Sequence, residues 1–181
     1  VLVEALRHLY LNKNNILKQR FNKNKKLLVL GDYEDKNTNY QLSILENLPI
    51  EILKDLKIIF KPHPASKLNS NSFPALKMEI SYKPLSVLLP LVNIVYCGSV
   101  TSASVDAFSY GLKVIVLLDQ KILNLSPLRN FEEVSFIVDS IQLKNVILNF
   151  FSKSIYYASP RVIFELSEEL PLWKKLLYTK S

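Results

Sequence analysis

The sequence predicts an α/β fold with a doubly wound, mostly parallel, Rossmann-like sheet. Short apolar runs alternate along the chain with segments in which apolar residues recur at helical spacing. Strands that are apolar on both faces are typical of parallel sheets covered by helices on both sides. Glycine or proline follows several of these runs and marks the ends of the strands.

The chain begins with a weakly helical stretch, in which asparagines lower the helix propensity. After it, the expected strands and helices alternate. Thr38 is a candidate N-cap for the helix after the first strand, and Pro49 would end it. We expect strands at 27–30, 57–60, 77–80, 93–97, 113–118 and 135–138, and helices at 38–48, 84–91, 101–110 and 141–151.

The pattern divides the chain into an N-terminal helical linker (1–26), a Rossmann-like domain (27–159) and a C-terminal helical tail (160–181). We expect the tail to lie along the domain surface, with Trp173 and Leu176 packing against a neighbour. The chain begins at Val1 in mid-pattern, which favours a piece of a longer protein.

The composition is that of a globular domain, with 49% hydrophobic and 22% charged residues among 181. One cysteine and two histidines exclude a disulfide framework and make a metal site unexpected. No apolar run reaches the length of a membrane span, and no signal peptide is visible.

The net charge of +7 is compatible with nucleic acid, an anionic membrane surface or an anionic small ligand. Much of the excess is lysine mixed with asparagine in the first 26 residues, which we interpret as solvated surface. We therefore expect no nucleic-acid partner, while peripheral membrane association stays open.

The three glycines, Gly31, Gly98 and Gly111, lie too far apart for a dinucleotide-binding or P-loop motif. Gly111 is explained as a helix C-cap. Gly31 and Gly98 follow strands, where glycine permits tight turns and close backbone approach.

The richest loop is 98–104, which carries Ser99, Thr101, Ser102 and Ser104 between a strand and a helix. Hydroxyls and backbone N–H groups at such a place favour phosphate binding. The alternative is simple capping of the helix by Thr101 or Ser102.

A second loop, 61–66, reads Lys-Pro-His-Pro-Ala-Ser. Two prolines fix the backbone around His63 and hold its ring in a defined direction. His63 can donate a hydrogen bond to phosphate, and as imidazolium it can neutralise a leaving group. Lys61 adds positive charge, with a solvated strand-end lysine as the alternative.

The remaining polar candidates have weaker signals. The acidic residues Asp32, Glu34 and Asp35 follow the first strand and fit a solvated turn better than acid–base or ribose-binding groups. Asp106 is either a ligand contact or an exposed helix charge. His8 is expected to be structural and apart from these loops, and Cys97 to be inert packing.

Together these features resemble the C-terminal, donor-binding half of GT-B-fold glycosyltransferases. Residues 93–117 are similar to that family's strand, serine-rich turn, helix with an acidic residue, and Ala-x-x-x-Gly-x-x-Val-Ile pattern. The segment Lys61–Pro64 resembles the His-Pro motif of bacterial sialyltransferases and Kdo-type capsule transferases, and the layout resembles a bacterial surface-carbohydrate-biosynthesis family.

The resemblance implies a nucleotide-sugar donor, such as a CMP-sugar, and metal-independent transfer to a glycan or lipid-linked acceptor, with no separate cofactor. It implies His63 as a catalytic residue and the following ligand-binding residues: Lys61, His63, Gly98, Ser99, Thr101, Ser102 and Asp106. A cytoplasmic location, with the inner face of the membrane as an option, follows from it.

The acceptor domain of such an enzyme would be missing from this chain, so we expect the chain alone to be inactive. The general base would come from that missing half or from Glu34 or Asp35. Two alternatives stay open: a non-catalytic module that binds a nucleotide or a partner, and a CDP-glycerol-type polyol-phosphate transferase domain.

Overall fold

The computed structural model describes residues 3–13, 25–66, 72–119, 121, 123–152 and 163–178. Its centre is a six-stranded sheet, ordered β3-β2-β1-β4-β5-β6, in which each strand runs parallel to its neighbours. The order reverses between β1 and β4, so the predicted α/β class and doubly wound sheet are confirmed. The strands are β1 (Lys25–Leu30), β2 (Leu56–Lys61), β3 (Met78–Ile80), β4 (Ile94–Gly98), β5 (Lys113–Leu117) and β6 (Ser135–Ile137).

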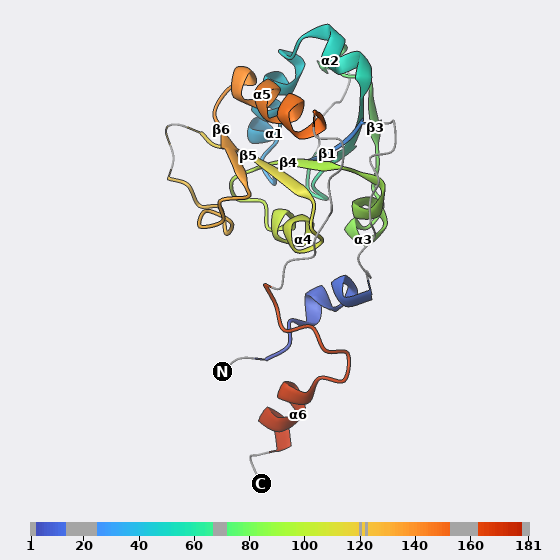
Figure 1. Ribbon diagram of the computed structural model, residues 1–181, viewed down its shortest axis with the longest axis vertical. Coiled ribbons are helices and arrows are strands. Elements are labelled where there is room, and N and C mark those ends of the chain that lie inside the picture. The colour runs from blue at the N-terminus through green and yellow to red at the C-terminus, as the bar shows by residue number, and fades with distance from the viewer. Residues whose placement is uncertain are drawn as a thin grey trace.

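Helices cover both faces of the sheet (Figure 1). One face carries α1 (Asp35–Glu46), α2 (Ile50–Asp55) and α5 (Ser140–Phe151). The other carries α3 (Leu85–Leu88), which runs into η3 (Leu89–Leu91), and α4 (Ala103–Ser109). Each face of the sheet has its own hydrophobic core, and alternate residues of β1 pack into one or the other. Val29 packs with Leu42 and Ile147, and Leu28 lies in the core that contains Phe108.

Two predicted boundaries are corrected, and one short helix was not predicted. Helix α1 begins at Asp35 and not at Thr38, which is buried inside the helix and does not cap it. Strand β1 begins at Lys25, because the backbone of Lys26 forms hydrogen bonds with Asn93. Helix α2 was not expected, since its six residues are too few for a clear period.

The two ends of the chain pack together on the side of the sheet that carries α4 (Figure 1). They form the 3-10 helix η1 (Leu6–Lys13) and the helix α6 (Pro171–Tyr178). The buried Glu4 carboxylate accepts hydrogen bonds from the backbone amides of Leu172 (2.7 Å) and Trp173 (3.0 Å). The Trp173 indole N–H donates to the Glu4 carbonyl (2.9 Å), and Trp173 is only partly buried.

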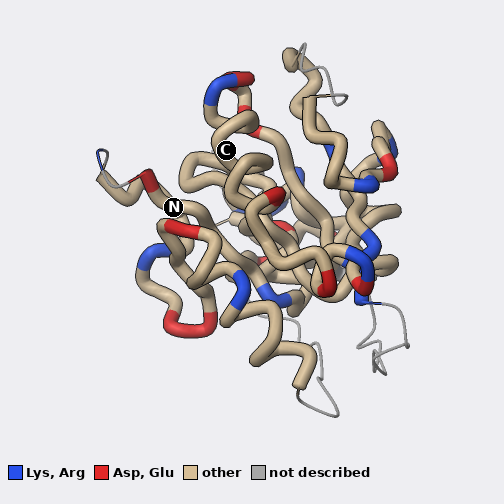
Figure 2. The backbone as a smooth tube through the Cα atoms, turned by 90° about the horizontal axis from the view of Figure 1, so that it is seen from above, with Lys and Arg blue, Asp and Glu red and all other residues tan. Residues whose placement is uncertain are grey.

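Charged residues are spread along the backbone: Figure 2 shows positions of Lys and Arg interspersed with those of Asp and Glu along the tube. Most of the lysine- and asparagine-rich stretch that we interpret as solvated surface, residues 14–24, lies outside the described residues. Within the described residues, every helix is too short or too polar to cross a bilayer.

Candidate functional site

Three strand ends lie at one level of the sheet. Leu30, the last residue of β1, pairs with Lys61 of β2 on one side and with Cys97 of β4 on the other. The Gly31 N–H then donates to the Lys61 carbonyl (2.9 Å). The loops after β1, β2 and β4 therefore leave the same carboxyl edge, at the point where the strand order reverses.

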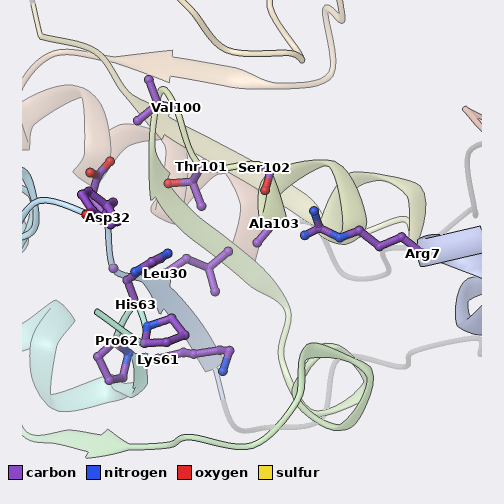
Figure 3. Close-up of a pocket in the computed structure, with 13 residues that line it drawn as sticks. Arg7, Leu30, Asp32, Lys61, Pro62, His63, Val100, Thr101, Ser102 and Ala103 are labelled. Carbon is purple, nitrogen blue, oxygen red and sulfur yellow. The ribbon is translucent and has the colours of Figure 1, made fainter. Parts of the chain in front are cut away.

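A cavity of about 360 Å³ lies between these three loops. This volume is in the range of small-molecule sites, roughly 300–1,000 Å³. Figure 3 shows His63 and Lys61 facing the cavity across from Thr101 and Ser102. The predicted approach of loops 61–66 and 98–104 is thus confirmed. The polar side chains that line the cavity are Arg7, Asp32, Tyr33, Lys61, His63, Thr101 and Ser102.

Gly31 allows the His63 loop to pack closely against the end of β1. A Cβ atom at this position would lie 3.2 Å from the His63 backbone nitrogen and 3.3 Å from the Pro62 Cα. Contacts this short would press the loop back by a few tenths of an ångström, so glycine favours the close approach here, as its place after a strand suggested.

A backbone hydrogen bond sets the tautomer of His63. The Ala65 N–H donates to His63 Nδ1 (3.2 Å), so Nδ1 is the acceptor and the neutral ring carries its proton on Nε2. The Tyr33 ring packs edge-on against the imidazole, with ring centroids 5.3 Å apart. His63 is therefore held as a hydrogen-bond donor through Nε2.

The hydroxyls of Thr101 and Ser102 are not used to cap α4. Ser102 occupies the N-cap position but its side chain forms no capping hydrogen bond. Thr101 Oγ1 is buried and has no hydrogen-bond partner among the described residues. Among the hydroxyl-bearing residues of this loop, only Ser104 forms a hydrogen bond within the loop, donating its hydroxyl to the Thr101 carbonyl (2.7 Å). The simple capping interpretation is wrong for this pair. Ser102 is exposed and its hydroxyl can reach a ligand in the cavity, whereas the unpaired Thr101 hydroxyl is buried in the unliganded protein.

Asp32 is the carboxylate that the structure brings into the cavity. Asp32 Oδ1 accepts from the Glu34 N–H (3.0 Å) and from Asn37 Nδ2 (3.3 Å), and Asp32 is only 4% exposed. A Cβ on Gly98 would lie 3.2 Å from Asp32 Oδ2, so glycine at the end of β4 makes room for this carboxylate. The expectation of a solvated turn is wrong for Asp32.

The other two acidic residues of that turn do not line the cavity. Glu34 is exposed, and the Asp35 carboxylate accepts a hydrogen bond from the Ser66 hydroxyl (2.5 Å). The apolar periodicity of the sequence could not separate the three, because their roles depend on where each side chain turns after β1.

Two predicted ligand residues lie next to the cavity and one lies away from it. Gly98 and Ser99 line a smaller neighbouring cavity of about 90 Å³, together with Asp32 and Asp119. Asp106 lines neither cavity and is buried, so the structure supports neither the ligand contact nor the exposed charge expected of it.

Asp106 instead contacts the N-terminal segment. His8 Nδ1 lies 2.5 Å from Asp106 Oδ1, and the imidazole stacks on Phe164 at 4.1 Å between ring centroids. His8 is structural, as expected, but it is not apart from the α4 region. Burial and the nearby Asp106 carboxylate raise the pKa of Tyr10 above its usual value.

Sequence reasoning missed two polar lining residues, Tyr33 and Arg7, of which Arg7 is the charged one. Arg7 comes from η1, about a hundred residues from α4 along the chain, and local patterns could indicate only a helical segment there. Among the described residues, no group of three or more His, Cys, Asp and Glu side chains is arranged to hold a metal ion.

Comparison with solved structures identifies the fold. A glycosyltransferase of kitacinnamycin superposes on this chain with a TM-score of 0.51 at 14% identity, covering 78% of this chain and 38% of the other. A putative UDP-N-acetylglucosamine 2-epimerase from Listeria monocytogenes gives a TM-score of 0.60 at 13% identity, covering 88% of this chain and 46% of the other. The chain has the Rossmann-like fold of a GT-B half.

The GT-B-like half spans less than half the length of both of these proteins. At these identities the likeness is one of fold, and it confirms the GT-B-like, Rossmann-like fold that the sequence predicted. No protein-family model and no curated protein matches the chain.

Proposed function

We propose that this chain is the nucleotide-sugar donor-binding domain of a glycosyltransferase that acts in surface-carbohydrate biosynthesis, on capsule or lipopolysaccharide. The observation that carries the proposal is the convergence of three strand-end loops on one cavity at the reversal of strand order. The cavity combines basic side chains with two hydroxyls that the protein itself leaves unused. That set of donors suits a phosphate group.

The reaction in this proposal is displacement at an anomeric carbon. An acceptor hydroxyl forms a bond to that carbon and loses its proton to a base, while the bond to the nucleotide phosphate oxygen breaks. The electron pair of the broken bond leaves with the phosphate, where negative charge develops. Donors held in place around that charge lower the barrier.

Each donor has a role that follows from its position. His63 Nε2–H donates to a phosphate oxygen, because Nδ1 is occupied by the Ala65 N–H. Lys61 supplies a positive charge from the end of β2, and the hydroxyls of Thr101 and Ser102 donate from the opposite wall. We place the general base on the acceptor-binding domain, since Glu34 and Asp35 do not line the cavity.

The finer features of the proposal rest on the resemblance of the Lys61–Pro64 motif. A CMP-sugar is the expected donor, and the acceptor is a glycan or a lipid-linked glycan held by a separate domain. With such acceptors, the proposed location is the cytoplasm, with the inner face of the membrane as an option.

Titration of CMP, CDP and UDP by calorimetry, with a chelator present, tests the proposal. We expect weak binding by the 181-residue chain and no transferase activity from it alone. His63→Ala should weaken binding by about 1–3 kcal/mol, the usual cost of a charge-assisted hydrogen bond. Lys54→Ala on α2, which lines neither described cavity, is the matched control and should bind like the wild type.

Two results would count against this function. If no nucleotide or nucleotide-sugar binds, the non-catalytic partner-binding module remains. If His63→Ala binds as tightly as Lys54→Ala, the phosphate does not occupy this cavity. A preference for CDP with activity toward polyol phosphates would favour the CDP-glycerol-type alternative.

A further inference from the structure

Arg7 brings a positive charge to the cavity from outside the sheet. Figure 3 shows its side chain reaching from η1 toward Ser102 and Ala103, on the far side of these residues from Asp32. Arg7 forms no ion pair with a carboxylate of the described part of the chain. Its guanidinium is therefore available to a ligand in the cavity.

The backbone around Arg7 is fixed by contacts on both sides. Before it, Glu4 is hydrogen-bonded to α6, and the Ala5 N–H donates to the Glu165 carbonyl (2.9 Å). After it, His8 contacts Asp106 and stacks on Phe164. An arginine carried by an anchored segment loses less conformational freedom on binding than one on a free loop.

The charges of the cavity fall into two groups. Lys61 and His63 lie together after β2, whereas Arg7 approaches past Ser102 from η1. The one carboxylate in the lining, Asp32, already accepts two hydrogen bonds through Oδ1. A single phosphate held by His63 and the hydroxyls would leave Arg7 without an anionic partner, while an adjacent second anionic group would provide one. The planar guanidinium suits a phosphate or carboxylate through paired hydrogen bonds.

We propose that Arg7 is a specificity residue that selects ligands with a second anionic group next to the phosphate bound by His63. The second group is either the β-phosphate of a nucleoside diphosphate or the carboxylate of a sugar acid linked to CMP. This inference rests on the proposed function and adds to it the charge of the donor.

The test compares three probes on the 181-residue chain: CMP with one anionic group, CDP with two phosphates, and CMP-sialic acid with a phosphate and a carboxylate. At least one two-anion probe should bind the wild type about 10-fold more tightly than CMP, the size expected for one charged contact. In Arg7→Gln that preference should fall below about 3-fold, with CMP affinity nearly unchanged. The probe that shows the Arg7-dependent gain identifies the second group.

Two further variants sharpen the result. Arg7→Lys keeps the charge without the planar fork and should restore part of the preference. Lys54→Gln removes one charge from α2, away from both described cavities, and should leave all three affinities unchanged.

The inference is overturned if the wild type has no preference for a two-anion probe, if the preference persists in Arg7→Gln, or if that variant loses CMP affinity equally. Should His63→Ala lose CMP binding while Arg7→Gln changes nothing, this inference fails and the proposed function stands. If no probe binds the wild type, both fail.

Discussion

Thr101 keeps a hydroxyl buried without a hydrogen-bond partner among the described residues. A buried polar group of this kind costs free energy in the unliganded protein and can regain it when a ligand pairs with it. A substitution of Thr101 therefore distinguishes two roles of its hydroxyl, stabilising the fold or binding a ligand.

We predict opposite effects of Thr101→Val on stability and on binding. The free energy of unfolding without ligand should rise by about 1 kcal/mol, because an unpaired buried hydroxyl is removed. Affinity for CMP should fall, because a donor is lost. Urea unfolding and calorimetry measure the two. Ser104→Ala, which removes a hydroxyl bonded to the Thr101 carbonyl, is the control and should lower stability. A destabilised Thr101→Val variant with unchanged CMP affinity would show that the hydroxyl serves the fold.

Cys97 illustrates a residue whose chemistry is suppressed by its place in the sheet. It is fully buried in β4, and burial, together with the nearby Asp32 charge, raises the pKa of its thiol to about 12. Since the thiolate is the reactive form, little of it exists at neutral or mildly alkaline pH.

We predict that a maleimide or disulfide reagent at pH 8 does not label Cys97 in the folded chain and labels it readily in urea. The chain has a single cysteine, so the labelled mass reports this residue alone. Equal labelling rates in the folded and unfolded chains would mean that β4 is not buried as described.

At the scale of elements, the loops after β1 and β2 depend on glycine at position 31. In Gly31→Ala, the new methyl group would press on the backbone of His63 and on Pro62. Overpacking of this kind costs about 1–3 kcal/mol. We expect lower stability in urea unfolding, together with amide shifts in residues 61–66 and weaker CMP binding. Stability and shifts identical to those of the wild type would contradict the close packing of these loops.

The attachment of α6 depends on the charge of Glu4. Burial opposes the charged form, but the amides of Leu172 and Trp173 outweigh it and hold the Glu4 pKa below its usual value. A lowered pKa means that the ionised carboxylate stabilises the docked α6 above about pH 4.5, and that this contribution is lost as pH falls through the lower native value.

Trp173 reports this docking, because it is the only tryptophan of the chain. We predict that its fluorescence emission shifts to the red as the pH falls below about 4.5, before the far-UV circular dichroism of the core is lost. In Glu4→Gln the red-shifted emission should be present at pH 7, with little further change on acidification. An emission maximum that moves only with global unfolding would contradict a carboxylate-dependent attachment.

At the scale of the whole molecule, much of the fold was predictable because continuous apolar runs mark buried parallel strands. The six strands appear near their expected positions, and β4 and β5 have the strongest runs. Loops 61–66 and 98–104 could be brought together by the topological rule alone, since both follow strands of one parallel sheet. The role of Gly111 in ending its helix was also predictable: it follows the C-cap residue Tyr110 and has a φ of 92°.

The parts that sequence reasoning missed depend on contacts between distant segments. Asp32 was grouped with solvated residues, but it is buried and its carboxylate accepts from the Glu34 N–H. Helix α1 begins just after this contact, at Asp35 and not at Thr38. Arg7 reaches the cavity only because η1 returns to α4, where His8 meets Asp106. No local period or motif encodes such a return.

The central claim is that one anionic ligand is bound where β1, β2 and β4 end. Amide chemical-shift mapping of the isotopically labelled chain during a CMP titration tests it most directly. We predict saturable shifts in residues 61–66 and 98–104 and near Asp32, with no comparable shifts in α2 or α5, which belong to the core on the opposite face from α4. Saturable shifts confined to other parts of the molecule, or no response at these three loops to any nucleotide, would contradict the account.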